Sequence, residues 1–181
     1  MDLREKKTKR AVRDAFLQLR AKKPLERITV KELTELAEIS KATFYLHYRD
    51  IYDLSEKMQN EVVEDIMTAV AQNEAALVDM DQTAKKLHAA FCAHQHLIDI
   101  LFSGSQASAL AGSIEQAIRD SIYRIKPGLR NNAQFNVLLS YQIHGAFYAY
   151  QENHKLLGDE VILSILDEIS ERLKDLLENG K

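Results

Sequence analysis

The stretch from Ile28 to Leu54 constrains the fold more than any other part of the chain, because two short helical patterns follow each other there with three residues between them. The first pattern places apolar residues on one side of a helix: Val30, Leu33, Leu36 and Ala37. Thr29 and Glu32 have the spacing of a capping box at its start. Glu38, Ile39 and Ser40 are too few for anything but a turn. The stretch therefore predicts two helices joined by a tight turn.

The second helical pattern runs from Lys41 to Tyr48, with Ser40 as its predicted N-cap. Phe44 and Tyr48 lie four residues apart, so both are expected to point inward. The opposite side then carries a charge, a methyl group, a hydroxyl, a phenol and an imidazole, from Lys41, Ala42, Thr43, Tyr45 and His47. Groups of these kinds suit phosphate and base-edge contacts, and the arrangement is that of a helix-turn-helix. Asp50 is the predicted cap of the helix that follows.

The same residues resemble the DNA-binding signature of TetR-family transcriptional regulators, over about residues 10–55. The positions that match are Thr29, Val30, Ser40, Thr43, Tyr45, His47 and Leu54. Three positions depart from the signature. Glu38 replaces a glycine that would accept positive φ freely, Tyr48 replaces a phenylalanine, and Ile51 replaces a lysine that commonly contacts a phosphate.

The resemblance implies a homodimer that binds double-stranded DNA at a pseudo-palindromic operator. The expected DNA-binding residues are Arg27, Thr29, Val30, Ser40, Lys41, Ala42, Thr43, Tyr45, His47, Arg49 and Tyr52. Thr43 and Tyr45, with Lys41 or Ala42, are expected to select the base sequence. His47, Thr29, Arg27 and the basic first helix are expected mainly to contact and position the DNA backbone. Because the isoleucine at position 51 cannot bind a phosphate, either Arg49 or Tyr52 is expected to do so in its place.

The distribution of charge agrees with a DNA-binding first segment. Residues 1–50 carry 13 Lys or Arg and 8 Asp or Glu, whereas residues 51–181 carry 11 and 19, within a total net charge of −3. Many of the basic residues lie near the start of a predicted helix over residues 3–23. A basic segment beside an acidic one is typical of a nucleic-acid-binding module joined to a regulatory domain, although surface charge also varies without function.

The rest of the chain also predicts helices, so the expected fold is all-α. A three-helix head over residues 1–50 is followed by a long helix from Asp50 to about Asn73, which leads into a helical regulatory and dimerisation domain over residues 51–181. Further helices are expected at about residues 83–102, 106–125, 132–156 and 159–179, the last capped by Asp159. The loosest connection, residues 73–82, separates the long helix from these.

The last two predicted helices are the expected dimerisation element, because one carries a broad apolar stripe and the other alternates bulky with small residues. The expected interface residues are Phe147, Tyr150, Ile162, Ile165, Ile169, Leu173 and Leu176. The alternative is that both stripes complete the core of a single chain.

Aromatic and polar-tipped residues recur along the helices of the second domain, and the resemblance implies a pocket there for a small-molecule effector. The candidate pocket residues are Phe91, Phe102, Tyr123, Tyr141, His144 and Tyr148. The same residues could form a filled core. The expected function is a regulator, most simply a repressor released by an effector. The alternatives are an activator, a regulator controlled by a partner protein, and a helical enzyme or interaction module.

Other chemistry finds little support in the sequence. His88, Cys92 and His96 recur every four residues, but three helical turns span about 12 Å, too far for one metal ion to join the outer two. We expect no metal, no cofactor and no catalytic residue. A charged N-terminus, the absence of a long apolar run and a single cysteine predict a cytoplasmic protein with no membrane span.

Overall fold

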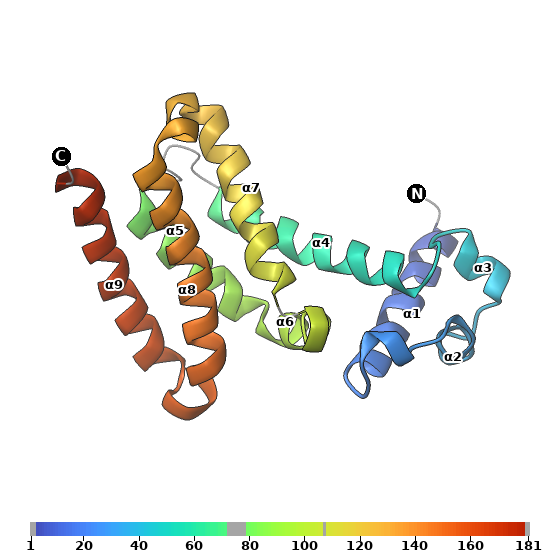
Figure 1. The fold of residues 1–181 in the computed structure, drawn as a ribbon. Coiled ribbons are helices and arrows are strands. Elements are labelled where there is room, and N and C mark those ends of the chain that lie inside the picture. Colours follow the sequence, from blue (N-terminus) through green and yellow to red (C-terminus); the bar gives the residue numbers. More distant parts are fainter. Residues whose placement is uncertain (1–2, 72–78, 107, 180–181) are drawn as a thin grey trace. The chain divides into compact units, whose positions relative to one another are not determined.

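The computed structural model describes residues 3–71, 79–106 and 108–179, and every regular element within these ranges is a helix (Figure 1). The predicted all-α fold is therefore confirmed. The helices are α1 (Leu3–Arg20), η1 (Leu25–Arg27), α2 (Val30–Leu36), α3 (Lys41–Tyr45), α4 (Ile51–Val70), α5 (Met80–Ala93), α6 (Gln95–Leu101), η3 (Gly104–Gln106), α7 (Ala109–Ile125), η4 (Pro127–Asn131), α8 (Ala133–Leu157) and α9 (Asp159–Asn179).

The chain forms two compact units. Unit 1 comprises Met1–Val62 with Gln95–Ala107, and unit 2 comprises Val63–His94 with Ser108–Lys181. The sequence placed the division at residue 50. It lies instead inside α4, and the segment containing α6 packs with the N-terminal helices rather than with the second half of the chain.

Helices α1 to α4 all contribute to the core of unit 1. Phe16 of α1, Leu33 of α2, Phe44 of α3 and Leu54 of α4 are all fully buried. Leu25 and Ile28 are also buried, as their positions after Pro24 predict. The expectation for Leu36 was wrong, because the last turn of α2 leaves it exposed while Ala37 turns inward.

The predicted helix over residues 83–102 is two helices. α5 ends at Ala93 because His94 leaves helical geometry, with φ −105° and ψ 7°, and its Nδ1 lies 2.9 Å from the backbone oxygen of Ala90. A side chain that bonds to the backbone one turn earlier competes with continuation of the helix. The two halves belong to different units, α5 to unit 2 and α6 to unit 1.

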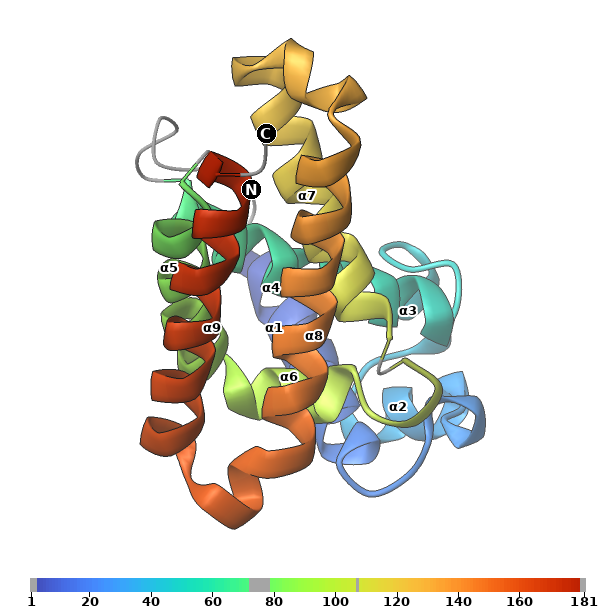
Figure 2. The ribbon, with the colours of Figure 1, turned by 60° about the vertical axis from the view of Figure 1, so that its left-hand side comes forward.

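In unit 2, α8 and α9 form an antiparallel pair joined by Gly158 alone, and α8 also packs against α7 (Figure 2). Gly158 has a φ of 81°, a conformation that glycine adopts without strain. Gln142 donates to Ser170 at 2.8 Å across the pair. Asp159 is the first residue of α9 rather than a cap that precedes it, and its Oδ1 accepts from the Tyr150 hydroxyl at 2.8 Å.

Candidate nucleic-acid interface and internal cavity

Helix α3 begins with a well-formed cap. The Ser40 hydroxyl accepts from the backbone N–H of Thr43 at 3.0 Å and lies 2.8 Å from the Thr43 hydroxyl. The Thr29 hydroxyl caps α2 in the same way, accepting from Glu32 N–H at 3.3 Å. The predicted N-caps of α2 and α3 are confirmed. The Glu32 carboxylate, which a capping box directs to the helix start, instead pairs with Lys23. The turn and both helix starts are thus fixed by local hydrogen bonds.

The turn between α2 and α3 contains a backbone conformation that a side chain disfavours. Glu38 has a φ of 54°, and it is the one non-glycine residue with positive φ in the described part of the chain. It stands where the family signature has glycine. For an L-residue with a Cβ this conformation costs roughly 1–2 kcal/mol, so the turn retains its geometry at some expense of stability.

Helix α3 ends at Tyr45 and not at Tyr48 as predicted, but one side of the segment from Lys41 to Tyr48 is buried and the other is exposed. The rings of Phe44 and Tyr48 are both buried, with centroids 5.5 Å apart, as predicted. On the opposite side Tyr45 is 56% exposed and Leu46 is 80% exposed. Leu46 was not among the residues predicted for this face, although the spacing that buries Phe44 and Tyr48 also predicts that the two residues after Phe44 point outward.

None of the residues expected to contact DNA is buried. Val30, Thr43 and His47 are half-buried, and the exposed ones are Arg27, Thr29, Ser40, Lys41, Ala42, Tyr45, Arg49 and Tyr52. Ile51, in contrast, is in the core. A lysine at position 51 would have to leave the core to reach a phosphate. The side chains that can contact a phosphate here are therefore the exposed neighbours, Arg49 and Tyr52.

The end of α3 is held by Lys57 of α4, which no sequence motif indicated. Lys57 donates from Nζ to the backbone oxygen of His47 at 3.1 Å and to Asp53 Oδ2 at 2.9 Å. Its ammonium group also lies 5.2 Å from the centroid of the Tyr48 ring. These contacts join the first turns of α4 to the residues that follow α3.

Asp53 is the centre of this arrangement. Its side chain is 7% exposed and also accepts from the backbone N–H of Arg49 at 3.0 Å and from Arg49 Nε at 3.1 Å. Hydrogen bonds from Lys57, from the Arg49 backbone and from the Arg49 side chain outweigh burial and lower the pKa of Asp53 to about 2. The carboxylate is therefore ionised at neutral pH, while the Arg49 side chain remains 81% exposed.

The basic residues at the start of α1 are partly compensated. Lys9 pairs with Glu5 at 2.8 Å, Arg10 lies 3.7 Å from Asp14, and Arg13 pairs with Glu61 of α4. Because these ion pairs neutralise part of the positive charge locally, fewer basic side chains of α1 are free to contact phosphates than the number in the sequence suggests.

Unit 2 contains a cavity of about 70 Å³ between α5, α7, α8 and α9. The wall is mainly apolar, with Phe91 and Phe147 among its aromatic members, and the side chains that bring polar atoms are Thr83, His88, Gln142 and Tyr150. The volume is several times the roughly 10–15 Å³ that one water molecule needs.

Only Phe91 of the six predicted pocket residues lines this cavity. Phe102 is buried in unit 1, Tyr141 and Tyr148 are exposed on α8, and Tyr123 and His144 lie in a separate polar network. These five residues do not line this cavity, because they were chosen by residue type. The wall is determined by which faces of the helices meet, and it consists mostly of aliphatic residues.

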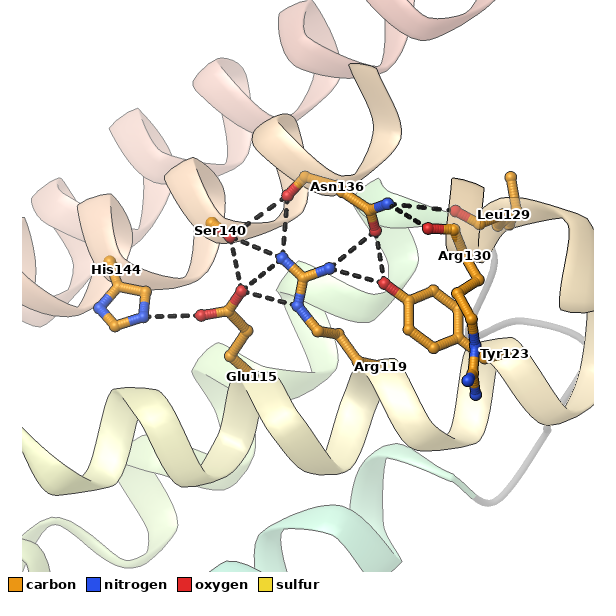
Figure 3. Close-up of polar contacts among 8 residues, drawn as sticks. All are labelled: Glu115, Arg119, Tyr123, Leu129, Arg130, Asn136, Ser140 and His144. Atoms are coloured by element: carbon orange, nitrogen blue, oxygen red, sulfur yellow. Dashed lines mark hydrogen bonds and ion pairs between the residues drawn. The ribbon is translucent and has the colours of Figure 1, made fainter. Parts of the chain in front are cut away.

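The polar network joins α7 to α8 (Figure 3). Arg119 donates to the Glu115 carboxylate at 2.6 Å, to the Ser140 hydroxyl at 2.7 Å and to Asn136 Oδ1 at 2.7 Å. Burial acts to raise the pKa of Glu115, but hydrogen bonds from Ser140, Arg119 and His144 outweigh it and the pKa is lowered. The network fixes the register of two helices that supply much of the cavity wall.

Helices α8 and α9 carry exposed apolar residues on the side that faces away from the core of unit 2. Ile162 is 4% exposed and belongs to the core of unit 2, together with Tyr150 and Leu166. Ile165, Ile169 and Leu176 are exposed, Leu173 is half-buried, and Phe147 lines the cavity. The seven predicted interface residues therefore divide between a core and a surface.

The repeated His88, Cys92 and His96 do not form a cluster. His88 lies 3.3 Å from Asp167, Cys92 contacts the Tyr150 hydroxyl at 3.7 Å, and His96 is exposed on α6. Within the described ranges, no three His, Cys, Asp or Glu side chains gather as metal ligands would.

Comparison with protein-family models gives no match to this chain, and comparison with curated proteins gives none either. In the part of the chain that the structure describes, no helix combines the length and the apolar character needed to cross a membrane.

Proposed function

We propose that the chain is a sequence-specific DNA-binding transcriptional regulator that acts through helix α3. The observation that carries the proposal is the two-sided character of α3 and the residues just after it: Phe44 and Tyr48 anchor one side, and Lys41, Thr43 and Tyr45 lie on the other, after a capped, tight turn. A major groove admits one helix, and contacts from its first residues to base edges specify sequence.

The surrounding charges and polar groups support the same role. Arg27, Arg49 and the exposed lysines of α1 suit phosphate contacts, which position the protein and make its affinity depend on salt. The Lys57 contact to the His47 backbone holds the end of α3 in place. A reading helix that is held before binding loses less conformational freedom on the DNA.

The regulator is proposed to act as a homodimer through the exposed apolar face of α8 and α9. A two-fold dimer presents two copies of α3 to half-sites about one helical turn, roughly 34 Å, apart. Exposed isoleucines and tyrosines at helical spacing favour such an interface over a solvated surface.

Control by a small molecule is favoured over control by a partner protein because unit 2 contains a mostly apolar cavity. A repressor released by its effector is the simplest form of such control. The effector changes DNA affinity only as far as it binds the two conformations of the regulator with different affinity. Helix α4 contributes to both units and is the proposed connection.

Selection from a random duplex library at low salt tests the proposal. The expected result is enrichment of a pseudo-palindromic site, with an affinity that falls linearly on a log–log plot against salt concentration. If repeated selection enriches no common site, the proposed function is wrong.

A further inference from the structure

The cavity of unit 2 is lined by two side chains whose hydrogen-bonding state can be assigned from their partners. The apolar part of its wall includes Leu87, Ile114, Ile118 and Leu139, and among the described residues the lining contains no lysine, arginine, aspartate or glutamate. The polar members therefore decide which molecules are accepted.

Gln142 contributes an unused acceptor. The Ser170 hydroxyl donates to the backbone oxygen of Leu166 at 2.9 Å, so its one proton is already committed. Ser170 must then accept from Gln142, and the 2.8 Å contact fixes Nε2 as the atom that faces Ser170. Gln142 Oε1, the other end of the amide, is buried and has no hydrogen-bond partner. A buried acceptor without a donor costs free energy that a suitable donor restores.

His88 contributes a second acceptor. Its Nδ1 lies 3.3 Å from Asp167 Oδ1, and a carboxylate accepts, so the ring proton is on Nδ1. Burial lowers the pKa of His88 more than Asp167 raises it, which favours the neutral ring. In that tautomer Nε2 has a lone pair and no proton, and the ring is part of the cavity wall.

We infer that the cavity binds a neutral, mainly apolar molecule that carries a hydroxyl group, of the phenol or alcohol class, and that the hydroxyl donates to His88 Nε2 or, where the buried Gln142 amide turns toward the cavity, to Gln142 Oε1. Two acceptors reward a donor and repel the oxygen atoms of a carboxylate or phosphate. An ammonium group finds no carboxylate among the described residues that line the cavity. The inference rests on the proposed function in one respect: the bound molecule is the effector of the regulator.

Binding of three ring-sized probes to the full-length protein tests the inference. Phenol and toluene have nearly the same shape and differ by a hydroxyl in place of a methyl group, and benzoate carries a carboxylate. A wholly apolar cavity binds toluene more tightly, because toluene is the less well hydrated of the two. We expect phenol to bind at least as tightly as toluene, and benzoate to bind at least roughly tenfold more weakly than phenol. Tighter binding of toluene or of benzoate, or no phenol binding at millimolar concentration, overturns the inference.

Variants identify the atoms involved. In the double variant His88→Phe with Gln142→Leu, the ratio of the toluene Kd to the phenol Kd is expected to fall roughly tenfold or more, with toluene binding retained. His96→Phe is the matched control, because His96 is exposed on α6 and outside the cavity. An unchanged ratio in the double variant overturns the inference.

The wild-type protein supplies a measurement that depends on no variant. With ¹⁵N-labelled histidine, the Nε2 resonance of His88 should shift on addition of phenol and not of toluene, and identical responses to both overturn the inference. Because none of these measurements contains DNA, a protein that prefers phenol but selects no operator supports the ligand assignment and refutes only the proposed regulator.

Discussion

Lys57 donates from its ammonium group to the backbone oxygen of His47 at 3.1 Å, ten residues earlier in the chain. The contact fixes the chain just after α3, so the orientation of the proposed reading helix depends on a side chain that does not belong to it. We expect Lys57→Met to lower operator affinity roughly fivefold, and amide exchange at His47 and Tyr48 to become faster. The slope of log affinity against log salt should stay the same. A slope reduced by about one would mean that Lys57 contacts a phosphate directly.

Because of Asp53, the stability of unit 1 is expected to change with pH in the acid range. Its folded-state pKa is about 2, below the unfolded value, so its contribution is complete above the unfolded pKa and is lost as the pH falls from roughly 4 toward 2. Urea midpoints of the wild type and Asp53→Asn should differ at pH 7 and converge across this window. Lys57→Met, which removes one of the hydrogen bonds to the carboxylate, should show a smaller pH dependence than the wild type. A difference that is constant from pH 7 to pH 3 would contradict this assignment.

Tyr45 and Tyr52 are a matched pair, since both are 56% exposed in unit 1. Replacing Tyr45 by alanine should cost about 1–3 kcal/mol of specific binding and relax the preference for base sequence. Replacing Tyr52 by alanine should weaken binding similarly for all sequences, or leave it unchanged. Gel-shift titrations against the selected site and against a scrambled duplex measure both effects. If the Tyr45→Ala variant loses thermal stability to the same extent as it loses specific binding, Tyr45 supports the fold and does not read the base sequence.

Glu38→Gly should stabilise the protein, because glycine adopts a φ of 54° without the clash that a Cβ makes. Removal of roughly 1–2 kcal/mol of strain is partly offset by the greater freedom of glycine in the unfolded chain, leaving a gain of about 0.5–1 kcal/mol. Glu35→Gly, at an exposed position inside α2, is the control and should destabilise by about 1 kcal/mol. Thermal unfolding distinguishes them by the sign of the change.

Ile165 and Ile162 differ in burial, 49% against 4% exposed, although both belong to the apolar stripe of α9. Ile165→Asp should convert the proposed dimer to a folded monomer, as seen by light scattering and circular dichroism. Ile162→Ala should keep the assembly and lower stability by about 2–4 kcal/mol, because it leaves a cavity in the core. A wild-type protein that is monomeric at micromolar concentration would rule out this interface.

The features that the sequence predicted correctly are those fixed by neighbours a few residues away. The caps at Thr29 and Ser40 need only a hydroxyl three residues before a backbone N–H, and the burial of Phe44 and Tyr48 needs only helical spacing. The helix break at His94 depends on a hydrogen bond from its side chain to the backbone oxygen of Ala90, and the apolar periodicity of the sequence does not reveal such a bond.

The features that the sequence missed depend on contacts between distant residues. Tyr123 and His144 were assigned to a pocket, but partners on two helices place them in the network with Arg119 and Glu115. A single apolar stripe on α9 contains both Ile162 and Ile165, and only the position of α8 decides which of them is core. The cavity wall likewise follows from helix packing, which residue types alone do not specify.

Each side of helix α8 makes or is proposed to make a specific contact. Leu139 and Ile143 line the cavity, Asn136 and Ser140 bond to α7, and Val137 and Tyr141 lie on the apolar face proposed for dimerisation. Most helices of a protein surface have one side on which substitutions are nearly neutral. A saturation mutagenesis scan should find no such side on α8. Tolerance to substitution along α8 should therefore lack the 3.6-residue periodicity that is expected along α1.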